Sequence, residues 1–353
     1  MSETTESRKD DAAQKFAGFG APPHPCEKIS ICLVGPRGAG KSAFVASLTD
    51  CVAQNAHGHA PELRPALQAI TRTEFERGVA AASKFEILEN LVSHYERLRE
   101  EFAAGGAPTS PSDLYEYHFR LSFNGAAPAE LLAKGPQLFE ITDIGGDIAA
   151  PEEGARSSIP IGVREKFATK LLGADVVLFV LPLLRLEECR WVPALSRLME
   201  RLALAPDRKA RRVVVAFSQY ERLFAQLGPS AFTYACDPAV ASYVLRKQVL
   251  ATPWLDPLRA LEAGPRGAKL RFTVFSAFGF TKNFQNPNLD PHRKTDRRFQ
   301  RPTPSGAPAL GEFWRPFLTA DPILAAALDE DSAFGFSYAQ LEAAERAGEG
   351  ENV

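Results

Sequence analysis

A lysine, a serine and three glycines near the amino end of the chain have the spacing of a phosphate-binding loop. Residues 35–42 read GPRGAGKS and fit the pattern G-x-x-x-x-G-K-[S/T]. In this pattern the glycines let backbone N–H groups turn inward around a β-phosphate, the lysine reaches the β- and γ-phosphate oxygens, and the serine binds Mg²⁺. The sequence therefore predicts a site for a nucleotide phosphate chain with these contacts: Gly35, Gly38, Ala39, Gly40, Lys41, Ser42 and Ala43.

The segments on either side of this loop are the ones that the motif requires. The apolar run 29–34 predicts a buried strand, and the apolar spacing of residues 43–48 predicts a helix. A helix N-terminus carries partial positive charge, so this helix would face the bound anion. Because a chance glycine-rich turn lacks this context, we favour the phosphate-binding interpretation.

Strand-like runs alternate with helical patterns along the rest of the chain. We expect strands near residues 28–34, 115–123, 137–142, 175–181, 212–217 and 270–275. Residues 115–123 alternate strictly, which predicts one wet face, whereas 176–180 and 213–217 do not alternate, as expected of central strands. The predicted fold class is α/β: a P-loop NTPase with a mostly parallel central sheet and helices on both faces.

A long stretch, 51–108, separates the P-loop helix from the second predicted strand. Apolar residues recur in it at three- and four-residue steps: Phe75, Val79, Phe85, Leu88, Leu91, Val92, Tyr95, Leu98 and Phe102. This stripe predicts a helical insertion packed on the body of the domain, with a partner surface as the alternative. We divide the chain into a disordered tail (1–26), a P-loop domain (27–320) and a C-terminal helix and tail (321–353).

Asp143 and Gly146 follow the third predicted strand in the order D-x-x-G. An acidic residue at this strand end can hold Mg²⁺ through water, and Gly146 can offer a bare backbone N–H to a γ-phosphate. A nucleotide switch senses its terminal phosphate in this way. The alternative is an Asp-Gly-Gly turn that closes the strand, but the position after a P-loop and a strand favours phosphate sensing.

The order of these motifs resembles the Ras-like (TRAFAC) GTPases and, more narrowly, the divergent bacterial double-GTPase (DO-GTPase) group associated with conflict systems. The resemblance covers about residues 28–282 and rests on GPRGAGKS, DIGG, and two buried strands that end in SQYE and SAF. It implies binding of GTP, or alternatively ATP, with Mg²⁺. It also implies slow hydrolysis and a switch that acts on a protein effector or regulator.

The resemblance places a base-reading role on six residues: Ser218, Gln219, Glu221, Ser276, Ala277 and Phe278. In the family, an N/T-K-x-D motif reads guanine through its Asp, and an S-A-K motif offers a backbone N–H to the guanine O6. Glu221 keeps the carboxylate on a longer side chain, and Gln219 removes the cation of the family's lysine. Phe278 also replaces a lysine, although an aromatic ring can stack on a base.

Residues around the γ-phosphate complete the predicted site. Lys41, Arg37 and Asp147 are the expected catalytic residues, with Asp147 where many GTPases carry a water-orienting Gln. Because Asp is shorter than Gln, we expect slow hydrolysis, relieved by an arginine from a partner or by Arg156 or Arg164.

Three residues are the expected metal ligands: Ser42, Asp143 and Thr109. Thr109 is the candidate switch-I threonine, but its loop of Gly, Pro and Ser is equally typical of a linker.

Composition narrows the class of protein. The 41 Lys and Arg nearly balance the 43 Asp and Glu, so no global field favours nucleic acid or acidic lipid. The five cysteines lack C-x-x-C spacing, and we predict reduced thiols and no zinc site. The longest apolar run, 176–184, is too short to span a bilayer, and the polar N-terminus lacks a signal-peptide core, so we expect a cytoplasmic protein. The basic segment 291–301 is expected to be a solvated loop rather than an RNA contact.

Two other classes of function stay open at this stage. A nucleotide-binding interaction module without turnover is one, because the water-orienting Gln is missing. An ATPase or kinase-like enzyme is the other, because the base-reading motifs are degenerate. The sequence does not indicate the oligomeric state.

Overall fold

The computed structural model describes residues 28–50, 66–69, 91–103, 114–122, 137–149, 159–183, 192–210, 212–250, 255–264, 267–280, 287, 316–327 and 335–350. Over these ranges the chain has no helix with the length and apolar character needed to cross a membrane.

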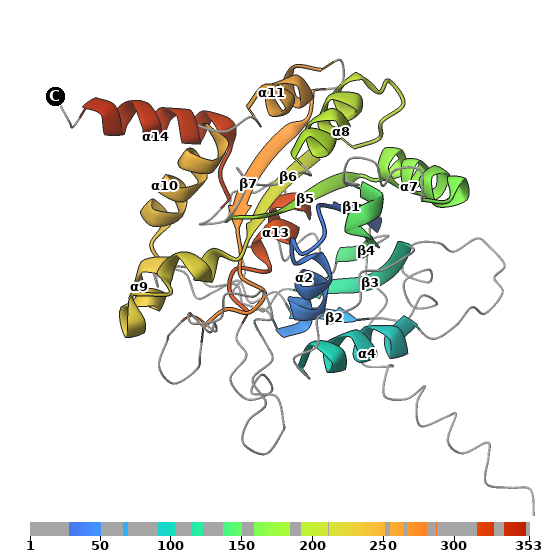
Figure 1. Cartoon of the computed structure of the whole chain (residues 1–353), viewed down its shortest axis with the longest axis horizontal. Helices are drawn as coiled ribbons and strands as arrows, with labels where there is room; N and C mark the ends of the chain where they lie inside the picture. The colour runs from blue at the N-terminus through green and yellow to red at the C-terminus, as the bar shows by residue number, and fades with distance from the viewer. Residues whose placement is uncertain are drawn as a thin grey trace, which may run out of the picture.

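Within the described residues, a central sheet of seven strands has the order β2-β3-β4-β1-β5-β6-β7 (Figure 1). The strands are β1 (Lys28–Val34), β2 (Ala66–Ala69), β3 (Leu114–Ser122), β4 (Gln137–Ile144), β5 (Val176–Pro182), β6 (Arg212–Ser218) and β7 (Lys269–Val274). Strands β4, β1, β5, β6 and β7 are parallel, while β3 runs antiparallel to β4 and β2 antiparallel to β3. The predicted mostly parallel α/β sheet is confirmed.

Helices cover both faces of this sheet, as parallel connections require. They are α2 (Lys41–Ser47), α4 (Leu91–Ala103), α6 (Gly146–Ala149), α7 (Ile161–Gly173), α8 (Val192–Leu204), α9 (Ala231–Ala235), α10 (Pro238–Val249), α11 (Leu255–Ala263), α13 (Asp321–Ala327) and α14 (Tyr338–Gly350). Short 3₁₀ turns are η1 (Leu48–Asp50), η3 (Tyr220–Phe224) and η4 (Gly228–Ser230). Helices α8 and α11 pack together on one side of the sheet, and α2 and α4 pack together on the other (Figure 1).

The six predicted strands are confirmed to within two residues at each end. Their central members are apolar on both faces, and residues 176–181 and 213–217 are all buried. The parallel register of β1 and β4 pairs Leu33 with Asp143. This pairing brings the end of β4 beside the P-loop, at the carboxyl edge of the sheet where α/β folds bind ligands.

The sequence predicted a helical insertion at 51–108, but the structure shows that this segment also contains a strand. It contains β2, which extends the sheet by pairing with β3, for example Leu67 with Leu121. A stretch of four residues, ALQA, is too short to show a strand period, so it gave no sequence signal. Helix α4 is confirmed, and its Tyr95 and Leu98 are buried in the core, with the Tyr95 hydroxyl 3.3 Å from the Ala46 carbonyl oxygen of α2. The stripe residues from Phe75 to Leu88 lie outside the described residues.

The apolar core continues past residue 320. Ile323 and Leu324 of α13 are buried against β5, β6 and β7, and α14 packs on α10 and β7. Arg246 of α10 and Glu345 of α14 form an ion pair of 3.0 Å. The division of the chain at residue 320 stays a prediction.

Candidate phosphate-binding site

The P-loop connects β1 to α2, and two of its residues have backbone dihedral angles in the left-handed region. Gly38 has a φ of 77° and Gly40 a φ of 91°, conformations that are costly for any residue with a Cβ. Helix α2 starts immediately afterwards, with the Phe44 N–H donating to the Gly40 carbonyl at 2.7 Å. The GxGK spacing therefore produces the loop and helix start that the motif predicted.

Lys41 is buried under its own loop. Lys41 is only 6% exposed. Its Nζ donates to the carbonyl oxygens of Gly35 at 2.8 Å and Pro36 at 3.1 Å. Burial lowers the pKa of Lys41, while the charges of Asp143 and Asp147 act in the opposite direction. The ammonium group is therefore held in place by backbone carbonyls before any ligand arrives.

Ser42 of α2 and Asp143 of β4 are in direct contact. The Ser42 Oγ donates to Asp143 Oδ2 at 2.8 Å. Among the described residues, Asp143 Oδ1 has no hydrogen-bond partner although Asp143 is only 1% exposed. Burial raises the pKa of Asp143, and the nearby Lys41 charge and the Ser42 hydrogen bond oppose this shift. A hard cation at this position would satisfy the second oxygen, so this residue pair fits Mg²⁺.

Gly146, the first residue of α6, touches the P-loop backbone. A Cβ placed on Gly146 would overlap the amide nitrogen of Arg37 and the carbonyl carbon of Pro36. Only glycine permits this approach, which brings the D-x-x-G segment against the loop. The neighbouring Asp147 and Arg37 are both exposed, so their side chains are open to solvent at the predicted γ-phosphate end.

The residues after β6 also reach the P-loop. The Ser218 Oγ donates to the Ala39 carbonyl at 2.6 Å, and the Gln219 Nε2 donates to the Gly38 carbonyl at 3.3 Å. Glu221, the expected base-reading carboxylate, is 0% exposed. The structure thus places the SQYE motif beside the phosphate loop, with its carboxylate enclosed by protein.

The motif after β7 pairs with the C-terminal part of the chain. The backbone N–H and carbonyl of Ser276 exchange hydrogen bonds of 2.8 Å with Phe317, and the Ser276 Oγ accepts from the Gly279 N–H at 2.6 Å. Ala277 is buried and Phe278 is half-buried. The phosphate residues and both base motifs therefore gather at the same edge of the sheet.

The structure does not place the other predicted site residues at the P-loop. Thr109, Arg156 and the basic segment 291–301 lie outside the described residues. Arg164 is exposed in the first half of α7. The switch-I metal ligand and the arginine contribution stay predictions.

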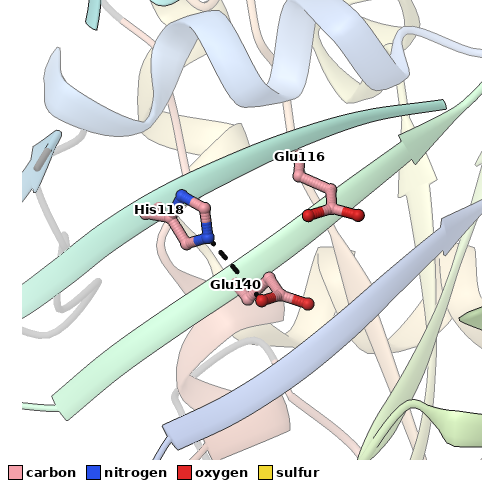
Figure 2. A group of neighbouring side chains, drawn as sticks. All are labelled: Glu116, His118 and Glu140. Atoms are coloured by element: carbon pink, nitrogen blue, oxygen red, sulfur yellow. Dashed lines mark ion pairs between the residues drawn. The ribbon is translucent and has the colours of Figure 1, made fainter. Parts of the chain in front are cut away.

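A polar cluster that the sequence analysis missed lies on the sheet under α7. Glu116 and His118 of β3 and Glu140 of β4 point toward one another, with their ligand-type atoms all within 4.8 Å (Figure 2). Lys170 of α7 contacts Glu116 at 2.6 Å and Glu140 at 3.4 Å, and Lys28 contacts Glu140 at 2.6 Å.

Two ammonium groups thus balance the two carboxylates of this cluster. Burial alone would raise the pKa of Glu140, but His118, Lys28 and Lys170 hold it well below its ordinary range. We interpret the cluster as an ion-pair network that fastens α7 to the sheet.

The predicted solvent-exposed face of β3 is wrong at His118, which is 4% exposed because it faces Glu140. The cluster of Glu116, His118 and Glu140 had one signal in the sequence. This was the E-x-H spacing of Glu116 and His118 on a predicted strand, which puts both side chains on one face.

Comparison with solved structures finds a similarity to nucleolar GTP-binding protein 1 of Plasmodium falciparum. The sequence identity is 13%, the TM-score is 0.28, and the match covers 73% of this chain and 81% of that one. No protein-family model and no curated protein matches the chain. The fold assignment rests on the strand order and on the P-loop between β1 and α2.

Proposed function

We propose that this chain is a P-loop nucleotide switch, which binds a nucleoside triphosphate with Mg²⁺, hydrolyses it slowly and signals its state to a protein partner. The observation that carries the proposal is the meeting of Lys41, Ser42, Asp143 and Gly146 at the carboxyl edge of β1 and β4. These four residues supply a cation, a metal-binding hydroxyl and carboxylate, and a backbone segment at the expected γ-phosphate position.

Each group has a defined role in this proposal. Lys41 neutralises charge on the β- and γ-phosphate oxygens, and the P-loop N–H groups donate to the same phosphates. Ser42 would hold Mg²⁺ directly and Asp143 through water, and the metal would supply charge screening when bound. The Gly146 N–H would respond to the presence of the γ-phosphate and move α6.

The narrower parts of the proposal come from the resemblance. We propose on this basis membership of the TRAFAC class and of the double-GTPase group, and a role in a bacterial conflict system. The resemblance also implies a preference for GTP over ATP. The GTP preference depends on Glu221 reaching the base. Protein purified under native conditions and then denatured would release its nucleotide, and identification of that nucleotide tests the proposal.

We expect any hydrolysis by the isolated chain to be slow, on the order of 10⁻³ per second, the intrinsic rate of switches without an engaged arginine finger. Asp147 is exposed and shorter than Gln, so it orients an attacking water poorly. Phosphate release measured under excess nucleotide checks this rate. Turnover of several per second would favour the dedicated ATPase or kinase-like class, and no release would favour the non-hydrolysing module.

Substitution of Gly146 tests the phosphate sensor. We expect Gly146→Ala to weaken triphosphate binding about tenfold or more, because the new Cβ forces α6 off the P-loop and removes a hydrogen bond to a charged oxygen. Diphosphate binding should stay unchanged, since no γ-phosphate is present. Titrations with both nucleotides measure the difference.

Gly162→Ala is the matched control, because a Cβ at Gly162 would meet no atom within 4 Å apart from its two chain neighbours and the backbone of its own helix. It should leave both affinities unchanged. Equal loss of triphosphate and diphosphate binding in Gly146→Ala would mean that the residue only supports the loop.

A further inference from the structure

Five residues of the expected base-reading motifs are enclosed by protein. The exposed fraction is 0% for Glu221 and Ser276, 2% for Ser218, 5% for Ala277 and 8% for Gln219. A protein reads a base through donors and acceptors that the base edge can touch. With a 0% exposed carboxylate, Glu221 presents no surface to a guanine edge in this conformation.

The side chains at the start of the SQYE motif donate hydrogen bonds to the phosphate loop. Ser218 holds the carbonyl of Ala39 and Gln219 holds the carbonyl of Gly38. Because the peptide bond is trans, fixing the Ala39 carbonyl turns the N–H of Gly40 the opposite way. These two side chains therefore set the orientation of the peptide groups that surround the phosphates.

The loop after β7 is locked by a different set of contacts. Ser276 pairs through its backbone with Phe317, and its hydroxyl accepts from Gly279. The Phe317 ring packs edge-on against Phe280 at 5.3 Å and stacks on Tyr220 at 6.4 Å. Opening this loop toward a base would break the backbone pair and disturb the aromatic cluster.

We propose that this chain selects nucleoside triphosphates by their phosphate chain and does not discriminate between bases. Ser218 and Gln219 act as positioning residues that brace the P-loop, and Glu221 is part of the enclosed protein interior. This inference rests on the proposed nucleotide switch and replaces the guanine preference that the resemblance implied.

Competition binding to the full chain tests the proposal. A ribose-labelled fluorescent GTP is bound in the presence of Mg²⁺ and displaced by GTP, ATP, CTP and UTP. We expect the four dissociation constants to agree within about threefold. A preference of tenfold or more for any one base would overturn the inference while leaving the nucleotide switch intact. Failure of the labelled GTP and of all four competitors to bind would overturn both.

Substitution of Ser218 distinguishes a residue that positions the P-loop from one that recognises the base. Ser218→Ala should weaken all four nucleotides alike, by about fivefold, because one buried hydrogen bond to the P-loop is lost. Ser47→Ala is the matched control, since Ser47 is also buried and donates to a backbone carbonyl, that of Phe44, within α2. It should leave all four constants unchanged. Loss confined to GTP in Ser218→Ala, or no loss for any nucleotide, would contradict the brace.

Glu221→Gln gives an independent readout. The inference predicts the same four constants in this variant as in the unmodified chain, because no base contacts the carboxylate. A selective loss of GTP binding would show that Glu221 reads guanine. The comparison of bases in the unmodified chain decides the proposal even where this buried substitution prevents folding.

Discussion

Lys41→Ala is expected to lower the affinity for a nucleoside triphosphate about 100-fold or more. Charge-assisted hydrogen bonds contribute about 1.5–3 kcal/mol each, and the lysine is expected to contact oxygens of two phosphates. Its Nζ already points into the loop, held by the carbonyls of Gly35 and Pro36, so little ordering is needed on binding. Titration of the purified variant with labelled triphosphate measures the loss.

The fold should survive this substitution. Lys41 is buried rather than on a solvent-facing loop, but its charge is a cost to the folded state, as its lowered pKa indicates. We expect the melting temperature to fall by no more than about 4 °C, which corresponds to about 1 kcal/mol for a domain of this size. A folded variant with unchanged affinity would contradict the phosphate-binding assignment.

Asp143→Ala is expected to remove most of the Mg²⁺ dependence of triphosphate binding and to abolish hydrolysis. In the proposed function Asp143 links the metal to β4, because Ser42 donates to its Oδ2 and its Oδ1 has no hydrogen-bond partner within the described part of the chain. Loss of such an outer ligand typically costs 10- to 100-fold in metal affinity or activity. Binding measured with Mg²⁺ and with a chelator gives the metal dependence directly.

Asp143→Asn is the matched variant, because it keeps the size of the side chain and an oxygen that can accept from Ser42. If the carboxylate charge is what matters, this variant should behave like Asp143→Ala. If both variants keep the metal dependence of the unmodified chain, Asp143 is a strand-end residue without a metal role.

The features that could be predicted from the sequence are those with a local physical signature. Continuous apolar runs such as 213–217 identified buried strands, and the glycines of the P-loop identified a turn that needs positive φ at Gly38 and Gly40. The D-x-x-G motif, which begins in the last residues of β4, placed Asp143 beside the loop, because parallel strands end at the same edge of the sheet.

The features that could not be predicted depend on contacts between distant residues. Strand β2 is too short for a period, and its place is set by pairing with β3. Glu221 is 0% exposed, and the motif SQYE does not encode this burial. The cluster of Glu116, His118 and Glu140 depends on the register of β3 and β4, in which His118 lies opposite Glu140.

The central claim is that the P-loop binds a triphosphate with Mg²⁺, and calorimetric titration of the full chain tests it most directly. GTP and ATP are titrated into the unmodified chain with Mg²⁺ and again with a chelator, and the same is done for Lys41→Ala. The account predicts one saturable site per chain, tighter with Mg²⁺ and weakened by the lysine substitution. Absence of saturable binding in the unmodified chain, or equal binding by a folded Lys41→Ala, would contradict it.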